Sequence, residues 1–498
     1  MMAEPLGVIA AGHPLSAQAG ADAMREGGNA VDCAVAAMLT SFACEPLLTG
    51  LGAGGYMVVV EPGNDPVVLD FFVEAPGRGA DAAARAELVP ISVSFGDAIQ
   101  VFNIGPASVG TYGMAAGVCE ASSRFGRIPL ADLVRPAAQL ARDGVELNGP
   151  QAYVIEILAG IVTSTPECAA LFAPGGHVAR AGDVVRQPEL AEALERLGSE
   201  GAAPFFTGDL AAAIVDWLAE RGGIVTAEDL AAYEVVDRTP LRVAYRGRDV
   251  VTNPPPSAGG ILIAHALALL GRERRAPDLG QVVATMERTQ AERTPEFIEG
   301  LDDPEFVRRF LARRSPLGST THVSVLDREG WACSVTCSNG SCSGVVVPGT
   351  GVHLNNMLGE QDLNPLGFHR HPPGRRMPSM MSPTAVLREG APELVLGSAG
   401  SNRIRSAILQ TIIRVIDDGL EAGDAVRAPR VHFEDGVVYA EPGIDTAALE
   451  RVGRAVGRFR ELNLFFGGVQ AVARDREGRF SGGGDPRRGG AALVVSAE

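Results

Sequence analysis

The sequence contains no lysine, so every one of its 43 Lys and Arg positions is an arginine. This absence excludes catalysts that need an ε-amine: a pyridoxal phosphate Schiff base, a phosphate-binding Walker lysine, a protein-kinase strand lysine and a serine-lysine dyad. We attribute the missing lysines to a GC-rich genome and not to selection on function. If the chain is an enzyme, its base must be another group.

Positive charge is also scarce relative to negative charge. With 43 basic and 60 acidic residues, the formal net charge is −17 and the pI is near 5.0. Neutralising nucleic-acid phosphates requires clustered cations, which this sequence lacks, so we expect no nucleic-acid partner. No stretch approaches the roughly 18 apolar residues of a membrane span, and residues 1–12 lack a signal-peptide pattern. The sequence therefore predicts a cytoplasmic protein without a membrane partner.

Cysteine is sparse, and the number of cysteines is odd. The chain has 7 cysteines, a pattern that is typical of reduced thiols and not of a disulfide framework. Cys333, Cys337 and Cys342 are close in sequence, but they lack a CxxC pair and a histidine at ligand spacing. We therefore expect neither a metal site nor a cofactor.

Glycine and proline, with 61 and 33 residues, indicate a compact, turn-rich fold. Apolar spacing and capping residues predict helices over 14–26, 29–42, 129–143, 188–197, 208–221, 226–232 and up to Leu270 after a turn at 254–260. Strands are expected at 56–60, 67–73, 321–326, 332–336 and 385–388. Residues 271–319 have the character of an exposed connector. A helical first half joined to a strand-rich second half indicates layered α/β architecture.

Thr320 is the most informative candidate for chemistry. A threonine hydroxyl is a poor nucleophile, but a threonine at a chain start can use its own α-amine as the base. That amine has a pKa of about 8, so no lysine is required. Thr320 is internal, so its hydroxyl would first have to attack the Ser319 carbonyl and break the chain. Taken alone, Thr320 is an ordinary strand-edge threonine, and only the surrounding motifs favour the nucleophile.

Ten short segments follow one another in an order typical of a single family. They are His13-Pro-Leu, Gly27-Gly-Asn-Ala-Val-Asp32, Gly50 to Gly55, Leu140-Ala-Arg-Asp-Gly144, Gly222-Gly-Ile-Val-Thr-Ala-Glu-Asp-Leu230, Pro254 to Gly260, Thr320-Thr-His322, Ser382-Pro-Thr384, Gly397-Ser-Ala-Gly400 and Asp485-Pro-Arg487. Across nearly the whole chain, the sequence resembles the γ-glutamyltranspeptidase family of N-terminal nucleophile hydrolases.

The resemblance implies a four-layer αββα sandwich, made as one precursor and self-cleaved into two intertwined subunits. Residues 1–319 would form the large subunit and residues 320–498 the small one, both within one αββα domain. Thr320 would be the nucleophile, and Ser338 matches the hydroxyl that supports it. Gly400 and Ser401 match the pair whose backbone N–H groups form the oxyanion hole, where each donor is typically worth about 3 to 4 kcal/mol.

The family's glutamyl-binding residues are largely replaced. Phe72 stands where the family has an arginine for the substrate α-carboxylate, and a phenyl ring can neither carry charge nor donate hydrogen bonds. Met357 and Glu360 align with the residues that hold the α-amine; Glu360 could still hold an ammonium, although it is one methylene longer than the family's aspartate. Of the paired serines, Ser379 remains and Met380 replaces the second. Asn339, next to Ser338, is expected to contact the substrate.

The segment that closes the family's pocket is short here, reading DLNPLGFHRHPPGRR from Asp362 to Arg376. It places His369, Arg370, His371, Arg375 and Arg376 near the expected mouth. One reading is a solvated turn. The other is that these side chains attract a dianionic substrate, with Arg375 as a binding residue. Met357, Met380 and Met381, with Phe72, suggest a more apolar pocket, although each is also an ordinary core residue.

These features lead to one main hypothesis and two alternatives. The main hypothesis is a self-processing threonine hydrolase or transferase for a small carboxylated acyl substrate, with altered glutamyl specificity. The short lid is similar to that of homologues in actinobacterial antibiotic pathways that make 4-alkylproline units, which would imply carbon-carbon bond hydrolysis releasing oxalate. A homologue that binds a ligand without self-processing is the other alternative. The two subunits are the expected partners, and a homodimer of such heterodimers stays open.

Overall fold

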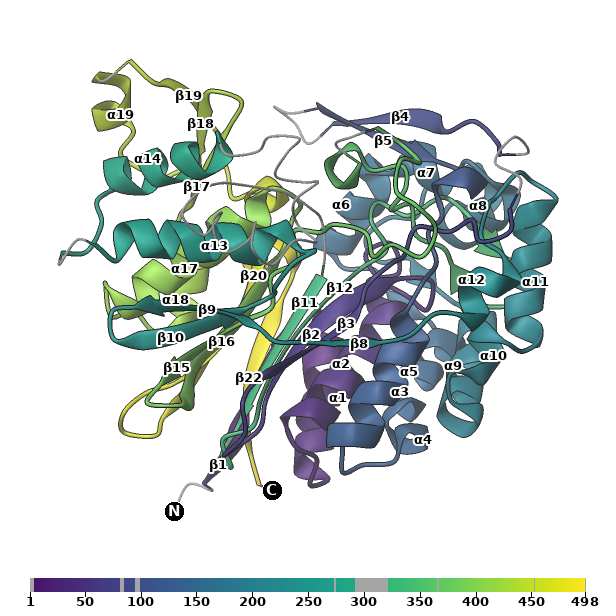
Figure 1. Ribbon diagram of the computed structural model, residues 1–498, viewed down its shortest axis with the longest axis horizontal. Helices are drawn as coiled ribbons and strands as arrows, with labels where there is room; N and C mark the ends of the chain where they lie inside the picture. Colours follow the sequence, from purple (N-terminus) through teal and green to yellow (C-terminus); the bar gives the residue numbers. More distant parts are fainter. Residues whose placement is uncertain are drawn as a thin grey trace.

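Two antiparallel sheets form the centre of the molecule (Figure 1). The computed structural model describes residues 4–80, 85–94, 99–272, 275–291, 321–364, 367–451 and 453–497. The seven-stranded sheet has the order β22 (Ala491–Ser496), β1 (Pro5–Ala11), β11 (Thr321–Asp327), β12 (Ala332–Ser338), β2 (Gly54–Val60), β3 (Val67–Phe71) and β8 (Val236–Arg238). The six-stranded sheet has the order β21 (Phe480–Gly484), β20 (Gly468–Arg474), β16 (Ala391–Ala399), β15 (Thr384–Arg388), β10 (Arg248–Thr252) and β9 (Leu241–Tyr245).

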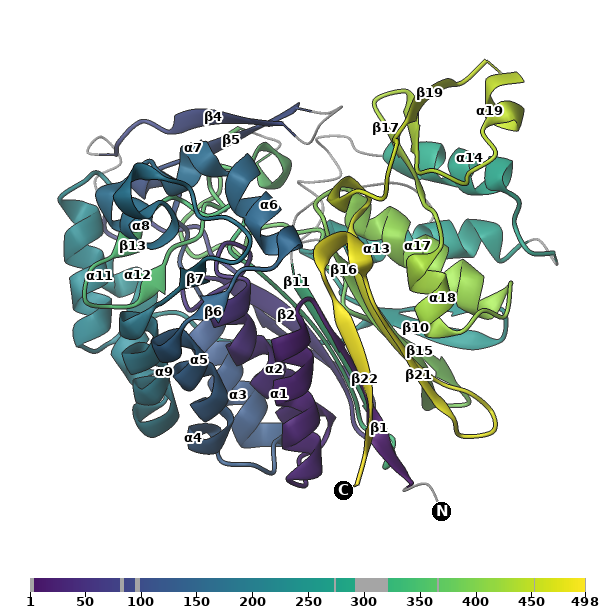
Figure 2. The same cartoon turned by 180° about the vertical axis from the view of Figure 1, so that it is seen from behind.

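Helices cover the side of each sheet that faces away from the other sheet (Figure 2). On the seven-stranded sheet lie α1 (Pro14–Arg25), α2 (Ala30–Cys44) and α3 (Met114–Phe125), with α5 (Arg135–Asp143) packed on α2 and α9 (Pro188–Glu200) packed on α5. On the six-stranded sheet lie α13 (Ala258–Leu270), α17 (Arg403–Ile416) and α18 (Ala422–Arg427), with α14 (Leu279–Gln290) packed on α13. Helix α2 is buried along its whole length. Its start is fixed by a capping box: the Asn29 side chain accepts the backbone N–H of Asp32, and the Asp32 carboxylate accepts the backbone N–H of Asn29.

The remaining elements lie around these layers. They are α4 (Leu130–Leu133), α6 (Gly149–Ile157), α7 (Ala159–Val162), α8 (Pro166–Phe172), α10 (Ala203–Phe206), α11 (Asp209–Ala219), α12 (Ala227–Ala231), α19 (Ala447–Arg451), β4 (Val89–Ser94), β5 (Ile99–Ile104), β6 (Val145–Glu146), β7 (Val184–Val185), β13 (Val346–Val347), β14 (Val352–His353), β17 (Val431–Glu434), β18 (Val437–Ala440) and β19 (Ala455–Arg458), with short 3-10 turns that include η6 (Leu464–Phe466) and η7 (Pro486–Arg488).

The apolar core falls into clusters that follow this arrangement. One cluster packs α1 and α2 on the seven-stranded sheet, and a second packs α13 and α17 on the six-stranded sheet. A third, which includes Val8, Val58, Val251 and Val395, takes side chains from both sheets and so lies between them. Each sheet therefore has two buried faces. This explains why strands such as β2 and β12 are apolar or small-polar throughout and do not alternate.

Both sheets combine strands from the two sides of residue 320. Strands β11 and β12 lie between β1 and β2, while β15 pairs with β10. The two segments therefore share each sheet and its core. Among the described residues, no single helix is both long and apolar enough to cross a membrane; Pro188–Glu200 and Ala203–Ala219 reach that length together, but they bend by 116° between them.

The expected helices at 14–26, 29–42, 188–197, 208–221 and 226–232 are confirmed within a few residues, as are the five expected strands. Residues 129–143 form two helices and not one, because Pro136 near the start of α5 cannot continue the preceding turn. The charged helical stretch expected within the connector 271–319 is present as α14, but its exposure is wrong, because Val283 and Met286 are buried in the cluster that α14 forms with α13 and β17. Residues 292–319 of the connector lie outside the described residues.

A buried ion-pair network ties the C-terminal strands to the region around β17. Asp485, fully buried, pairs with Arg430 at 2.7 Å and with Arg487 at 3.1 Å, and it accepts the Val469 N–H at 2.7 Å. Arg487 also pairs with Glu441. The two arginines hold the pKa of Asp485 below its usual value despite its burial. The Asp485-Pro-Arg487 motif is thus structural.

We expect Asp485→Asn to lower the free energy of unfolding by about 3–5 kcal/mol, because it leaves two buried guanidinium groups with one carboxylate. Urea unfolding followed by circular dichroism measures this loss. Asp424→Asn removes an exposed partner of Arg427 and should leave the midpoint unchanged. Equal midpoints for the two variants would contradict a structural role for the network.

Candidate active site

The strand that follows the predicted nucleophile begins beside the predicted supporting hydroxyl. Thr320 and Ser319 lie outside the described residues, and Thr321 is the first residue of β11. Thr321 pairs with Cys337 across the sheet, so Ser338 lies at the same end of the neighbouring strand. Ser338 is fully buried, and its hydroxyl accepts the Gly340 N–H at 2.9 Å. The sequence expectation that these two segments meet is therefore consistent with the strand register.

Glu45, which the sequence argument overlooked, lies at this same end of β11. It follows α2 directly as the C-cap residue and is 2% exposed. The Thr321 hydroxyl donates toward its two carboxylate oxygens at 3.3 and 3.4 Å. Burial raises the pKa of Glu45 to about 7, while Thr321 and Arg488 act in the opposite direction. An acidic residue directly after a predominantly apolar helix was the available signal in the sequence.

The predicted oxyanion turn follows β16. Gly400 and Ser401 have φ values of 116° and 55°, so two consecutive residues lie in the left-handed region. A Cβ on Gly400 would lie 2.6 Å from the Cα of Gly467, which means that the two backbones pack directly against each other. A non-glycine residue such as Ser401 in this region is typical of turns held by their surroundings at functional sites. The Ser401 side chain is buried.

Arg488 lies beside this turn and was not singled out from the sequence. A Cβ on Gly400 would be 3.5 Å from its Nη2 atom, and one on Gly468 would be 2.3 Å from its Cδ atom. Burial and the neighbouring charge of Arg403 lower the pKa of Arg488 to about 10, so the group stays cationic at neutral pH. A positive charge therefore lies close to the predicted oxyanion donors.

The histidine of the Thr320-Thr-His322 motif is structural. His322 is 1% exposed; its Nδ1 lies 2.7 Å from the Thr336 hydroxyl and its Nε2 lies 2.8 Å from the Ser324 hydroxyl. Gly397 of the facing sheet leaves room for the ring, because a Cβ there would lie 2.3 Å from it. Burial lowers the pKa of His322 to about 3. The ring is therefore neutral and committed to neighbouring hydroxyls.

The loop after β12 is held by amide and carboxylate side chains. Asn339 donates to the His353 carbonyl at 3.2 Å, and Asn356 donates to the Ser341 hydroxyl at 2.6 Å. Glu360, 2% exposed, accepts the Ser341 N–H at 2.8 Å. Asn339 and Glu360, both predicted to bind substrate, thus also fix the backbone next to Ser338.

Phe72 and Met357 occupy one apolar cluster between the sheets. Both are 1% exposed, and Met377 and Met381 belong to the same cluster. The Phe72 ring stacks on Tyr56, with centroids 5.4 Å apart. The two positions predicted to replace the family's arginine and amine-binding residue therefore share one apolar cluster.

Ser379 and Met380, which align with the family's paired serines, lie in different environments. Ser379 is 2% exposed, and its hydroxyl accepts the Met381 N–H at 3.0 Å. Met380 instead packs in the cluster beneath α13. Met380 is thus core packing on the helix side, while Met381 shares the cluster of Phe72.

Arg376 does not lie free at a pocket mouth, contrary to one reading of the sequence. It is 7% exposed, and its Nη1 donates to the Phe72 carbonyl and the Tyr233 hydroxyl, both at 2.5 Å. Asp70 and Glu74 lie 3.5 and 3.6 Å from its guanidinium. Because these carboxylates balance its charge, the prediction that Arg376 helps to attract a dianionic substrate is wrong.

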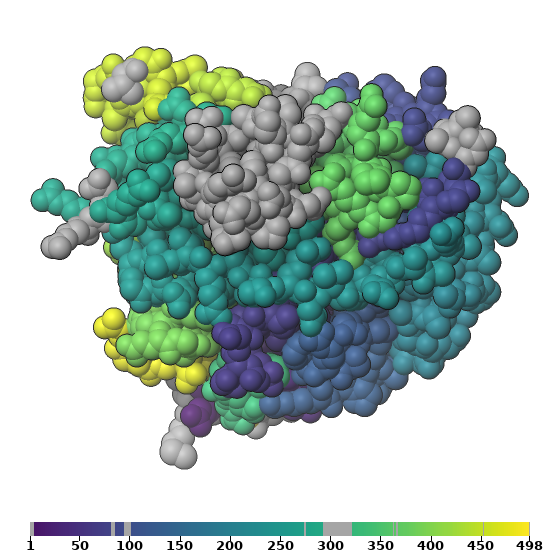
Figure 3. Space-filling view, viewed as in Figure 1, coloured from purple at the N-terminus to yellow at the C-terminus, as the bar shows by residue number. Residues whose placement is uncertain are grey.

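The other residues of the short segment lie nearer the surface. His369 and His371 line a cavity of about 150 Å³ with Arg85, and Figure 3 shows the green surface of this segment against the indigo surface of the chain near residue 80. Burial and Arg85 lower the pKa of His369 to about 4, so its ring is neutral at pH 7 and contributes no positive charge. Arg375 is half-buried and Arg370 exposed.

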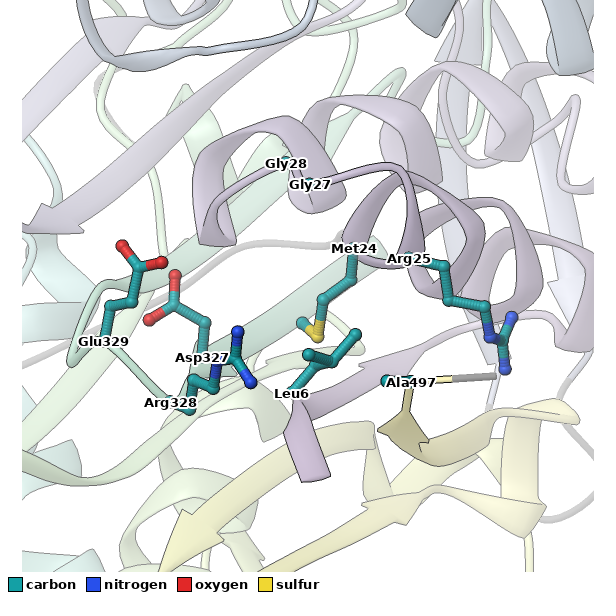
Figure 4. A pocket seen from close by; sticks show the side chains of 9 residues that line it. All are labelled: Leu6, Met24, Arg25, Gly27, Gly28, Asp327, Arg328, Glu329 and Ala497. Carbon is teal, nitrogen blue, oxygen red and sulfur yellow. The ribbon is translucent and has the colours of Figure 1, made fainter. Parts of the chain in front are cut away.

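A separate cavity of about 320 Å³ lies at the opposite end of β11, between Arg25, Arg328, Glu329 and Asp327 (Figure 4). Because β11 has seven residues that each advance about 3.3 Å, this cavity is about 20 Å from Thr321. Asp327 there accepts the backbone N–H groups of Ala30 and Trp331. No group of three or more His, Cys, Asp or Glu side chains within the described ranges is arranged to hold a metal ion.

Comparison with known proteins agrees with this arrangement. The family model described as γ-glutamyltranspeptidase matches residues 16–308 and 279–495. The acylase ACY 1 proenzyme of Pseudomonas sp. (strain SE83) is 31% identical, over 98% of this chain and 94% of that protein. The glutathione hydrolase proenzyme of Escherichia coli (strain K12) is also 31% identical, over 97% of this chain and 90% of that protein.

Solved structures show the same mixed α/β fold. Cephalosporin acylase from Bacillus halodurans superposes with a TM-score of 0.85 at 26% identity, covering 100% of this chain and 97% of that one. The structure titled LmbA2991T421A has a TM-score of 0.80 at 23% identity, covering 99% and 98%, and shares the fold. By family model, sequence and fold, this chain belongs to the γ-glutamyltranspeptidase family of N-terminal nucleophile hydrolases, which are enzymes.

Proposed function

We propose that the chain is an N-terminal threonine hydrolase that cleaves itself between Ser319 and Thr320. The products, residues 1–319 and 320–498, would remain together as a four-layer αββα enzyme. Its substrate would be a small carboxylated acyl compound, bound without the usual glutamyl contacts. The observation that carries the substrate assignment is the apolar cluster that contains both Phe72 and Met357.

The proposed reaction uses the amine that self-cleavage exposes. The α-amine of Thr320, with a pKa of about 8, takes the proton of the Thr320 hydroxyl as its oxygen attacks the substrate carbonyl. The N–H groups of Gly400 and Ser401 would hold the resulting oxyanion, and the nearby charge of Arg488 favours the same state. Ser338 would support the nucleophile from the adjacent strand. Water then releases the acyl group from Thr320.

Poor glutamyl recognition follows from the charges at the site. A γ-glutamyl group carries a carboxylate and an ammonium, and desolvating either against Phe72 or Met357 costs free energy without a compensating partner. Arg376 cannot substitute for the missing arginine, because Asp70 and Glu74 already balance its charge. Two of the similar proteins are named acylases, which supports an acyl amide as the substrate.

A carbon-carbon bond hydrolase is the second candidate, and the apolar cluster also favours it. Thr320 would attack a ketone that bears a carboxylate, the carbon-carbon bond would break, and the leaving carbon would take a proton. Water would then release oxalate from Thr320. An alkyl-bearing ring would pack against Phe72 and Met357 better than a charged amino acid would.

We expect Thr320→Ala to remain a single chain, because the variant has no hydroxyl to attack the Ser319 carbonyl. Gel electrophoresis under denaturing conditions distinguishes one band from two. Thr336→Val, which removes a buried hydroxyl from the neighbouring strand, should still be cleaved. Recovery of two subunits from Thr320→Ala would contradict the nucleophile, and a wild-type chain that stays whole would favour the non-processed alternative.

We expect glutaryl p-nitroanilide to be hydrolysed with kcat/KM at least about tenfold above that of γ-glutamyl p-nitroanilide, since the glutaryl group lacks the ammonium that Met357 cannot accept. Release of nitroaniline at pH 8 measures both. Oxalate release from a 2-oxo acid bearing an alkylated ring tests the second candidate in parallel. Faster γ-glutamyl turnover would show that the replacements at positions 72 and 357 do not determine specificity.

We expect Gly400→Ala to lower kcat by about 100-fold or more, because the added Cβ would push the turn away from Gly467 and misplace an oxyanion donor. Gly419→Ala is the matched control, since Gly419 also has a positive φ but nothing within 4 Å of an added Cβ. The control should lose about 1–2 kcal/mol of stability and keep its kcat. Similar kcat values in the two variants would exclude Gly400 from the oxyanion hole.

A further inference from the structure

We propose that Glu45 is a positioning residue that fixes the nucleophile end of β11 against the Gly400–Ser401 turn, acting through Thr321 on one side and Arg488 on the other. The proposal rests on the proposed function, in which the residue before Thr321 is the nucleophile. It assigns a role to a carboxyl group that none of the proposed reaction steps uses.

The first contact is with β11 itself. Thr321 donates its hydroxyl toward both oxygens of Glu45, at 3.3 and 3.4 Å, and Thr321 is only 3% exposed. The contact is made by the residue joined directly to Thr320. Because the peptide unit is rigid, the orientation of Thr321 limits that of the preceding residue. A shift of Glu45 would therefore move the start of β11.

The carboxylate is itself held in place on its other sides. A Cβ at Gly12 would lie 2.5 and 2.8 Å from the two carboxylate oxygens, so the backbone at the end of β1 packs directly on the carboxylate. The Glu45 N–H is bonded to the Ser41 carbonyl at 2.7 Å as the cap of α2. Glu45 thus connects the end of the buried helix α2 to the start of the buried strand β11.

The second link runs to the oxyanion turn. The charges of Arg488 and Glu45 act on each other, since each shifts the pKa of the other toward its charged form. Arg488 also lies against Gly400 and Gly468, as the close approach of its Nη2 and Cδ atoms shows. A carboxylate at position 45 therefore helps to keep a buried cation next to the predicted oxyanion donors. Loss of the Glu45 charge would leave the buried positive charge of Arg488 with less negative charge to compensate it.

The groups that face Glu45 come from five elements. They are Thr321 of β11, Arg488 of η7, Cys337 of β12, Cys44 of α2 and the backbone of Gly12 directly after β1. Burial raises the pKa of the Cys44 thiol well above its usual value and that of the Cys337 thiol to about 12, and it lowers the pKa of His13, the residue after Gly12, to about 4. None of the three therefore changes charge near pH 7. Glu45, with a pKa raised to about 7, is the group in this set that titrates there.

The pH dependence has a defined sign. Above about pH 7 Glu45 is ionised, accepts the Thr321 hydroxyl and balances Arg488. As the pH falls through this value the charge is lost and the turn loses its support. The α-amine of Thr320 must also be deprotonated, which alone gives a slope of about one, so log kcat of the cleaved wild-type enzyme should fall more steeply than this over about one pH unit below pH 7.

The test compares Glu45→Gln, Thr321→Val and the double variant in purified, cleaved enzyme. We expect Glu45→Gln to lower kcat about tenfold with KM within about twofold, and to reduce the acid slope to about one. Thr321→Val should lower kcat about threefold, and the double variant should be no worse than Glu45→Gln, because both changes break one path. Should Glu45→Gln fail to fold, Thr321→Val carries the kcat comparison.

Asp327→Asn is the matched control, since Asp327 is a buried carboxyl with a pKa raised to about 6 at the opposite end of β11. It should keep the wild-type kcat and the steeper acid fall of the wild-type enzyme. A wild-type kcat and slope in Glu45→Gln, or the same losses in Asp327→Asn, would overturn the proposal.

A second readout separates this proposal from the proposed function. If the wild-type chain neither cleaves itself nor turns over substrate, the proposed function fails. Urea unfolding of the Glu45→Gln and Thr321→Val variants and of the double variant then tests the coupling directly. Non-additive losses of stability would support the link between the two residues, and additive losses would overturn it.

Discussion

The contact between the two sheets determines where every part of the candidate site lies. His322 on β11 fits against Gly397 on β16, and Gly400 at the end of β16 packs backbone to backbone on Gly467. A side chain at position 397 would push His322 and the two sheets apart, so the spacing between the sheets depends on the missing Cβ of Gly397. Gly400 and Gly467 instead lie at the ends of the neighbouring strands β16 and β20, so a Cβ at position 400 would displace the turn within the six-stranded sheet. The contact of β11 with β16 thus links the strand that follows Thr320 to the strand that leads into the Gly400–Ser401 turn. The buried, neutral His322 serves this packing and does not act as a base.

Charge at the site is distributed differently from what γ-glutamyl recognition requires. The cations near the predicted oxyanion turn, such as Arg488, come from the C-terminal segment, whereas positions 72 and 357 are apolar. Burying the charges of Arg376 and Asp485 costs desolvation free energy, and pairing with groups of opposite charge offsets that cost. Glu45 is the exception, since its partners only partly offset its burial and its pKa remains raised. Such a group is well placed to act near the chemistry, where perturbed pKa values gather.

Much of the fold could be predicted from the sequence, because helices such as α1, α2 and α9 have clear apolar spacing and capping residues. Two elements were missed: β1, which is completed by a strand far along the chain, and α17, although its apolar residues from Ile404 to Ile413 follow helical spacing. Motif order brought Ser338, Gly400 and Phe72 to attention. It could not find Glu45 or Arg488, because their importance lies in contacts with residues more than 200 positions away or in close backbone approaches. It also could not show that Arg376 is neutralised, since Asp70 and Glu74 are distant in sequence.

The central claim is that Thr320 becomes a chain start and carries the acyl group. Intact-protein mass spectrometry of the enzyme, quenched with acid during turnover of a slow acyl substrate, tests both parts at once. The account predicts a fragment with the mass of residues 320–498 plus the acyl group, and fragmentation of that species places the added mass on its first residue. An acyl group on any other residue, or an uncleaved chain of 498 residues that still turns over substrate, would contradict it.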